Sequence, residues 1–152
     1  MQVIIITGSS DGIGAEMARQ LAKQHGTQIA LVLAARNEGL LQQVAADCRS
    51  RGAQTLVLKT DVSQQAQCRA LIDASIQKFG RLDGLINNAG RSAQALFAEV
   101  DDLSWYEELM RINFWGSLWC THAALPHLKA SKGKIVAVSS LAGLIGVPGR
   151  TA

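Results

Sequence analysis

Cysteine is scarce in this sequence, and its few copies show no pattern typical of a metal or redox site. The three cysteines are Cys48, Cys68 and Cys120. They are odd in number and far apart, without C-x-x-C spacing or histidines at metal-ligand offsets, so we interpret them as buried or incidental thiols. The histidines at positions 25, 122 and 127 have no mutual spacing of a metal site either. We therefore predict no bound metal.

Long apolar runs and blocks of like charge are also lacking. Stretches such as residues 3–6 and 29–35 are far too short to cross a bilayer, so we predict no membrane span. The short apolar start, without a basic leader or cleavage site, leads us to expect a cytoplasmic protein. The net charge of +3 comes from scattered Lys and Arg that are not interleaved with aromatics, which argues against nucleic-acid binding.

What the sequence does contain is enough apolar residues for one core. Hydrophobic residues make up 48% and charged residues 18% of the 152 positions. The mean hydropathy is +0.13, which excludes a disordered polar chain. The length suits a single domain, which we place at residues 1–152.

Five apolar segments are typical of buried strands. They are rich in β-branched residues and continuous rather than alternating, as expected for strands covered on both faces. These segments span residues 2–6, 29–35, 55–60, 82–87 and 134–140.

Apolar residues with helical spacing fill the intervals between these strands. They are Ile13, Met17 and Leu21, then Leu40, Leu41, Val44, Ala45 and Cys48, and then Leu71, Ile72, Ile76 and Phe79. A fourth helix is predicted over residues 104–129, with Ser104 opening a capping box. Gly26 and Gly52 are predicted C-terminal caps, and Asp61 is a candidate N-cap of the third helix.

The alternation of strand and helix predicts an α/β fold, a doubly wound parallel sheet of Rossmann type. In such sheets, ligands bind beyond the carboxyl ends of the strands, where the strand order reverses. The functional residues are therefore expected at the strand ends.

A glycine-rich turn follows the first predicted strand. Residues 7–14 read Thr-Gly-Ser-Ser-Asp-Gly-Ile-Gly and open directly into a helix. The glycines permit a tight turn and a close approach of the backbone to a diphosphate, which the free N–H groups and the positive helix end favour. On its own, such a turn is also compatible with a plain strand-to-helix loop.

Two further motifs stand at strand ends, namely Asn-Asn-Ala-Gly at 87–90 and Ser-Ser at 139–140. Together with the glycine turn, Asn113 and the segment GKIVAVSSLAG at 133–143, they form an ordered set along the whole chain. In this pattern the sequence resembles the non-extended branch of the short-chain dehydrogenase/reductase family. The resemblance implies that five strands are present and that further C-terminal strands are absent, so we expect a domain incomplete at its C-terminus.

The resemblance also implies a catalytic asparagine, serine, tyrosine and lysine. Asn113 and Ser140 match the first two, with Ser140 holding the substrate oxygen and Asn113 supporting a water-mediated proton path. The tyrosine is expected at the position after Ala152, so it and its lysine are missing. Tyr106 has Met110 four residues on, in place of lysine, and is interpreted as a structural residue. These 152 residues alone are therefore expected to be inactive.

The cofactor contacts follow from the same resemblance. The predicted cofactor-binding residues are Gly8, Ser10, Gly12, Ile13, Gly14, Arg36, Asp61, Val62, Asn88, Ala89 and Gly90. No acid precedes Arg36 at the end of the second strand, so its guanidinium favours the 2′-phosphate of NADP over the ribose hydroxyl of NAD. A solvated arginine is the alternative, and Asp11 departs from NADP-preferring relatives, which carry a basic residue in the turn. Asp61 and Val62 are expected beside the adenine.

The leading hypothesis is an NADP-dependent oxidoreductase that transfers a hydride between nicotinamide and a ketone or secondary alcohol. The alternative is a dinucleotide-binding module without turnover, and a methyltransferase-like sheet is disfavoured by the motifs at 87–90 and 139–140. The expected partners are a small carbonyl or alcohol substrate and, for the complete protein, further copies in a homodimer or homotetramer that pairs the helix at 104–129. Without further strands the fifth strand would be a bare apolar edge, so we expect the isolated chain to aggregate.

Overall fold

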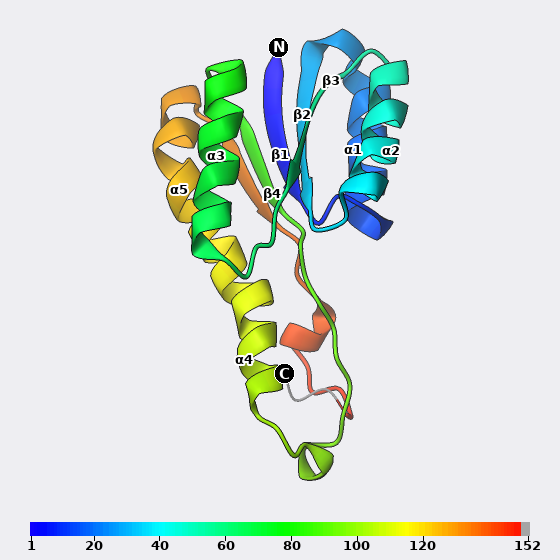
Figure 1. The fold of residues 1–152 in the computed structure, drawn as a ribbon, viewed down its shortest axis with the longest axis vertical. Coiled ribbons are helices and arrows are strands. Elements are labelled where there is room, and N and C mark those ends of the chain that lie inside the picture. Colours follow the sequence, from blue (N-terminus) through cyan, green and yellow to red (C-terminus); the bar gives the residue numbers. More distant parts are fainter. Residues whose placement is uncertain (150–152) are drawn as a thin grey trace.

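A computed structural model describes residues 1–149 and places a parallel sheet between two layers of helices (Figure 1). The strands are β1 Gln2–Thr7, β2 Ile29–Ala35, β3 Gln54–Lys59, β4 Gly84–Asn87 and β5 Lys134–Ala137. They pair in parallel in the order β3-β2-β1-β4-β5. The predicted doubly wound sheet is confirmed, and its strand order reverses between β1 and β4.

The helices that connect the strands cover both faces of the sheet. They are α1 Gly12–His25, α2 Glu38–Ser50, α3 Gln65–Phe79, α4 Ser104–Met110 and α5 Gly116–Ser131. Of these, α1 and α2 lie on one face, and α3 and α5 lie on the other. The short 3-10 turns are η1 Gly26–Gln28, η2 Phe97–Glu99 and η4 Leu141–Gly143, and η3 Arg111–Trp115 is a π-helical turn. Because η3 joins α4 to α5 without a break, the predicted helix over 104–129 is present and extends to residue 131.

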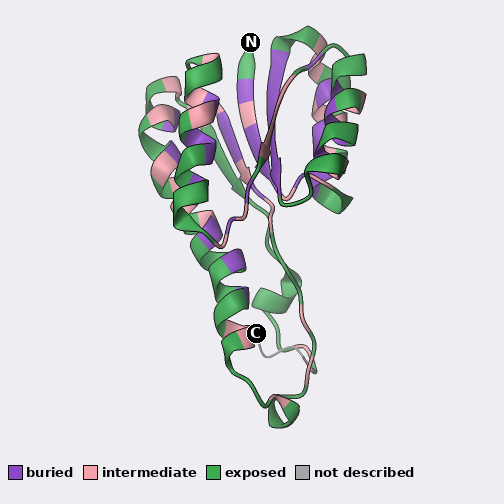
Figure 2. Ribbon diagram, in the orientation of Figure 1, coloured by how far each residue is buried: buried purple, intermediate pink, exposed green. Residues whose placement is uncertain are grey.

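An apolar cluster lies on each face of the sheet. Successive residues of β1 point to opposite faces, so Val3 and Ile5 pack under α3 and α5, whereas Ile6 packs under α1 and α2. All residues of β2 are buried, which explains why its sequence is an unbroken apolar run (Figure 2). In the register of β1 against β2, Ile5 lies opposite Val32, and both residues are fully buried in the core.

The contact between α1 and the sheet is made by alanines. Ala15, Ala18 and Ala22 are buried, and these small side chains let the helix lie close to the strands. The predicted core stripe beginning at Ile13 is wrong at its first position, since Ile13 is 66% exposed. Ile13 stands in the first turn of α1, beyond the end of β1, where no strand lies beneath it.

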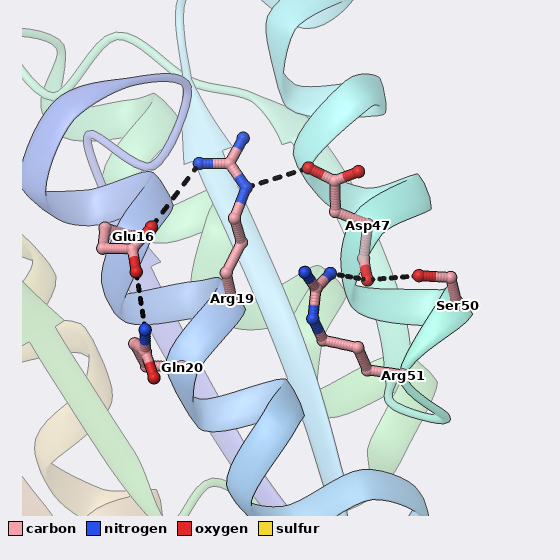
Figure 3. A network of polar contacts seen from close by, with 6 residues as sticks. All are labelled: Glu16, Arg19, Gln20, Asp47, Ser50 and Arg51. Carbon is pink, nitrogen blue, oxygen red and sulfur yellow. Dashed lines mark hydrogen bonds and ion pairs between the residues drawn. The ribbon is translucent and has the colours of Figure 1, made fainter.

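A polar network joins α1 to α2 on the outer surface (Figure 3). The Arg19 Nε donates to Asp47 at 2.8 Å, and its Nη1 lies 4.0 Å from Glu16. The Asp47 carbonyl accepts hydrogen bonds from Ser50 and Arg51 in the last turn of α2. Because the ion pairs are partly exposed, each is worth about 0–1 kcal/mol, and the apolar contact beneath them holds the helices together.

Two predicted helix caps are wrong. Ser104 does not accept a capping hydrogen bond; its N–H and hydroxyl instead both donate to Asp102, at 2.8 and 2.7 Å. Asp61 is not the N-cap of α3, which begins at Gln65. Its carboxylate accepts from the Ser63 N–H at 3.0 Å, a local turn that ends before the helix starts.

The predicted glycine caps agree with the structure. Gly26 caps α1 with φ 50°, and Gly52 follows the last turn of α2 with φ 92°, a backbone conformation that glycine adopts without strain.

The fifth strand differs from its prediction as a buried strand. Every residue of β5 is exposed, with Ile135 at 43% and Val136 at 48%, because no strand or helix covers its outer edge in the described residues. Residues 88–103 and 138–149 extend together beyond the carboxyl ends of the strands, and the Ala95 N–H donates to the Gly149 carbonyl at 2.9 Å. Figure 2 shows this extension as mainly exposed.

Within residues 1–149, no helix combines the length and the apolar character needed to cross a membrane.

Candidate functional site

A cleft of about 520 Å³ opens at the carboxyl ends of β1, β2 and β4, at the point where the strand order reverses. Its walls come from the turn after β1, the ends of β2 and β3, and the loop after β4. The lining residues are Gly8, Ser10, Asp11, Gly12, Ile13, Ala35, Arg36, Asn37, Leu40, Thr60, Asp61, Val62, Asn88, Ala89, Gly90, Arg91 and Ile112. Every predicted cofactor residue except Gly14 lines this cleft.

The glycine turn forms the floor of the cleft. Gly8 has φ 65° and Gly12 has φ 51°, so both adopt the left-handed conformation that the sequence pattern suggested. Gly14 lies beneath the surface, where a Cβ atom would stand 2.3 Å from the Gly8 carbonyl oxygen. Gly14 therefore shapes the turn from below, because any side chain at this position would displace Gly8.

The first turn of α1 presents free backbone donors to the cleft. The first hydrogen bond within the helix runs from the Ala15 N–H to the Asp11 carbonyl, at 3.1 Å. The N–H groups of residues 12–14 thus have no partner within the helix, and they carry the positive end of its dipole. No side chain caps this end, since Asp11 makes no capping hydrogen bond. The geometry suits an anion such as a diphosphate.

Hydrogen bonds from two neighbouring strands hold the glycine turn in place. The Gly8 N–H donates to the Ala34 carbonyl at 2.7 Å, and the buried Ser9 hydroxyl accepts from the Ala34 N–H at 3.0 Å. From the other side, Asn88 donates through its Nδ2 to the carbonyls of Thr7 and Gly8, both at 3.0 Å. The predicted ligand residue Asn88 is therefore also a brace of the turn.

Thr7 was not predicted as a site residue, yet it organises the loop after β4. Its hydroxyl oxygen accepts from the backbone N–H groups of Asn88 and Ala89, at 3.1 and 3.0 Å, and its hydroxyl lies 3.4 Å from the Ile86 carbonyl. Thr7 is buried, with 2% of its surface exposed, so its hydroxyl acts on the backbone and not on solvent. In the sequence, the signal for this bracing role is its position at the end of a strand directly before the glycines.

The β2 end of the cleft carries Arg36. Its side chain follows the last residue of β2 and is exposed, while Asn37 accepts from the Leu40 N–H at 3.1 Å and caps α2. The neighbouring wall is tied down by the Thr60 N–H, which donates to the Ala35 carbonyl at 2.9 Å. Asp61 and the 8%-exposed Val62 complete this end.

The predicted catalytic pair lies outside the set of cleft-lining residues. The Asn113 amide, within η3, accepts from the Arg91 N–H at 2.8 Å and donates to the Arg91 carbonyl at 2.9 Å. The Ser140 hydroxyl oxygen accepts from the Ala142 N–H at 3.2 Å and starts η4. Each side chain thus fixes a loop that follows a strand, and Val138 joins the two loops through its N–H, which donates to the Asn87 carbonyl at 2.9 Å.

Two thiols lie directly behind the cleft wall. The Cys68 thiol donates to the Val62 carbonyl at 3.4 Å, and Cys68 and Cys120 are both fully buried between α3 and α5. A hydrogen bond between the two thiols lowers the pKa of Cys68, while the same bond and burial raise the pKa of Cys120. The described residues contain no cluster of His, Cys, Asp or Glu suited to a metal ion.

Comparison with known proteins gives consistent results. Residues 2–152 match the family described as short chain dehydrogenase. The chain is 43% identical over 148 residues to 11-beta-hydroxysteroid dehydrogenase A of Sesamum indicum, covering 97% of this chain and 42% of that protein. It is 45% identical over 148 residues to 11-beta-hydroxysteroid dehydrogenase-like 4A of Arabidopsis thaliana, covering 97% and 48%. The chain thus spans less than half the length of these relatives.

Among solved structures, an alcohol dehydrogenase from the archaeon Thermococcus sibiricus, complexed with 5-hydroxy-NADP, superposes with a TM-score of 0.92. The identity is 27%, and the match covers 99% of this chain and 63% of that one.

Proposed function

The chain belongs to the short-chain dehydrogenase family, and from this premise we propose that it forms the NADP-binding part of an oxidoreductase acting on a ketone or secondary alcohol. The observation that carries the proposal is the cleft at the strand-order reversal, which the predicted cofactor residues line. When bound there, the nicotinamide supplies or accepts the hydride.

The residues of the cleft fit a dinucleotide. The unpaired N–H groups at the start of α1 would hold the diphosphate, and around Gly12 nothing lies within 4 Å of where a Cβ would stand, so the backbone is open to close approach. Asp61 and Val62 would contact the adenine. The turn that would bind the diphosphate is already held by Ser9, so little ordering would be needed on binding.

The preference for NADP over NAD rests on Arg36. A guanidinium at the end of β2 matches the charge and shape of a 2′-phosphate. Its sequence neighbours Ala35 and Asn37 offer no carboxylate to accept hydrogen bonds from the ribose hydroxyls of NAD. The archaeal alcohol dehydrogenase was solved with an NADP analogue, which supports the same choice.

Calorimetric titration of the chain with NADPH, NADH and S-adenosylmethionine tests the proposal. We expect NADPH to bind about tenfold more tightly than NADH, and Arg36→Gln to remove that difference, because one charge-assisted phosphate contact is lost. S-adenosylmethionine should not bind. Binding of neither dinucleotide would refute the cofactor site, and an unchanged preference in Arg36→Gln would refute the role of the arginine.

For the complete protein, Ser140 would hold the substrate oxygen. Its hydroxyl oxygen already accepts from Ala142, which leaves its own O–H to donate to a carbonyl oxygen. Asn113 would act near the same centre, in a water-mediated proton path and by fixing the Arg91 backbone. The names of the plant relatives suggest a bulky alicyclic ketone or alcohol as the substrate.

The same 152 residues contain one tyrosine, Tyr106, and no Tyr-x-x-x-Lys sequence. Without a positioned acid and base for the substrate oxygen, we propose that these residues bind NADP without turnover. The absorbance of NADPH should stay constant when the chain is mixed with a cyclic ketone. A measurable rate that disappears in Ser140→Ala would overturn this second proposal.

Self-association is proposed for the complete protein through the outer face of α4 and α5. Trp115 and Trp119 stack there with ring centroids 5.8 Å apart, and Met110 is 52% exposed beside them. Light scattering should give the mass of a dimer or tetramer, and Trp115→Arg should shift that mass toward a monomer.

A further inference from the structure

Two cationic side chains reach the cleft among the described residues, and they stand at its opposite ends. Arg36 follows β2, whereas Arg91 lies in the loop that follows β4. Since β2 and β4 flank β1 on opposite sides, β1 and the glycine turn separate the two guanidinium groups. Arg36 and the first turn of α1 already account for the phosphates of the proposed cofactor, so Arg91 has no role toward the cofactor in that scheme.

The backbone of Arg91 is fixed at the cleft wall. Asn113 accepts from its N–H at 2.8 Å and donates to its carbonyl at 2.9 Å, so the residue is held on both sides of its Cα atom. Asn113 is also the asparagine that the family resemblance places in the catalytic centre. Arg91 therefore stands at the end of the cleft where the substrate is expected.

The side chain of Arg91 remains available to a ligand. Its Nη1 donates to the Glu108 Oε1 at 2.7 Å, and the two side chains are 47% and 49% exposed. An exposed pair of this kind holds its partners weakly. Glu108 contacts one edge of the Arg91 guanidinium, which carries five N–H donors, so the other edge can still form a bidentate contact.

From this placement we propose that Arg91 binds a carboxylate of the substrate, so that the complete enzyme acts on an acidic ketone or hydroxy compound. The inference rests on the proposed oxidoreductase function and adds the charge of its substrate. The planar fork of a guanidinium matches the two oxygens of a carboxylate. Glu108 then tunes the site, because it competes with the ligand for Arg91 and repels the incoming anion.

The test compares two ketones that differ in charge and by one methyl group, levulinate and its methyl ester, by NMR titration of the NADPH-saturated chain. Levulinate should bind about tenfold more tightly than the ester. Arg91→Gln should abolish this difference, whereas Glu108→Gln should strengthen levulinate binding. Arg111→Gln is the matched control. Arg111 is an exposed arginine on the helical segment that also holds Glu108, and it does not line the cleft, so its replacement should leave the affinities for both ketones unchanged.

Equal affinities for the two ketones, or a preference that persists in Arg91→Gln, would overturn the proposal. A tenfold loss of NADPH affinity in Arg91→Gln would also overturn it, because Arg91 would then serve the cofactor phosphates. If Arg91→Gln does not fold, Glu108→Gln decides alone, and unchanged or weaker levulinate binding in that variant counts against the proposal. The calorimetric titration with NADPH and a levulinate titration without NADPH together separate the two claims. Absent NADPH binding refutes the proposed function, while an Arg91-dependent preference for levulinate without NADPH still supports the anion site.

Discussion

Replacing Gly14 by alanine should destabilise the chain although Gly14 lies in a helix. A Cβ there would stand 2.3 Å from the Gly8 carbonyl oxygen, 2.9 Å from the Gly8 carbonyl carbon and 2.5 Å from Asn88 Nδ2. Two of these atoms belong to the backbone, so the turn itself must move. Overpacking of this severity costs about 3 kcal/mol, and the better helix propensity of alanine returns about 1 kcal/mol. We expect a net loss of about 2 kcal/mol in the free energy of unfolding.

Gly39 provides the matched control in the first turn of α2. A Cβ there would lie 3.5 Å from Asn37 Oδ1, an ordinary contact, and its φ is not positive. Gly39→Ala should therefore stabilise the chain by about 0.5–1 kcal/mol, because alanine loses less backbone entropy on folding. The two glycine-to-alanine changes are expected to have opposite signs.

Urea unfolding followed by circular dichroism measures both free energies, and titration with NADPH measures the effect on the cleft. Gly14→Ala should also weaken NADPH binding, because Gly8 lines the cleft and its displacement would change the shape of the glycine turn. The reasoning is refuted if Gly14→Ala is as stable as the parent chain, or if Gly39→Ala loses as much stability as Gly14→Ala.

Three further changes test other parts of the structure. The hydrogen bond with Arg81 lowers the pKa of Asp83, so Asp83→Asn should lose about 1–3 kcal/mol at pH 7. Since a lowered pKa gives stability above the unfolded value, this gap should close in urea titrations as the pH falls below about 4, and a gap constant to pH 2 would contradict it. The buried Cys68 and Cys120 thiols should react with a maleimide only after unfolding, and labelling of the native chain in a mass spectrum would contradict their burial. Lys132 has φ 55° at the end of α5. Lys132→Gly should raise the free energy of unfolding measured in urea by up to about 1 kcal/mol, and Lys132→Ala should not.

The sequence predicted the strands best where burial on both faces left one pattern possible. The predicted and observed limits of β2 are the same at both ends, because all of residues 29–35 are buried. The same kind of run at residues 134–140 gave a strand that is exposed and ends at Ala137. An apolar run shows that a segment can form a buried strand. Whether the strand is in fact buried depends on the elements that pack against it, and β5 has too few of them among the described residues.

The site was predicted as a set of ligand contacts, and the structure adds the residues beneath them. Ser9 and Thr7 are short hydroxyl side chains with no motif of their own, and their roles appear only once β2 and β4 lie on either side of β1. Gly14 was predicted as a contact because it belongs to the motif, and the structure adds that its missing side chain leaves room for Gly8. The π turn around Asn113 has no signature in apolar spacing, since both helical forms bury Leu109 and Ile112 on one side.

The two halves of the site differ in how they are supported, and this difference bears on function. The glycine turn rests on β1 and β2, whose cores are buried, and hydrogen bonds from Ser9 and Asn88 fix it without a ligand. Ser140 follows an exposed strand, and in the described residues its hydroxyl contacts only the adjacent turn. A preformed anion site loses little entropy on binding, whereas a catalytic serine must be held to within a fraction of an ångström to act. The same geometry thus favours dinucleotide binding by these residues, whereas among the described residues the Ser140 hydroxyl is held through its own turn alone.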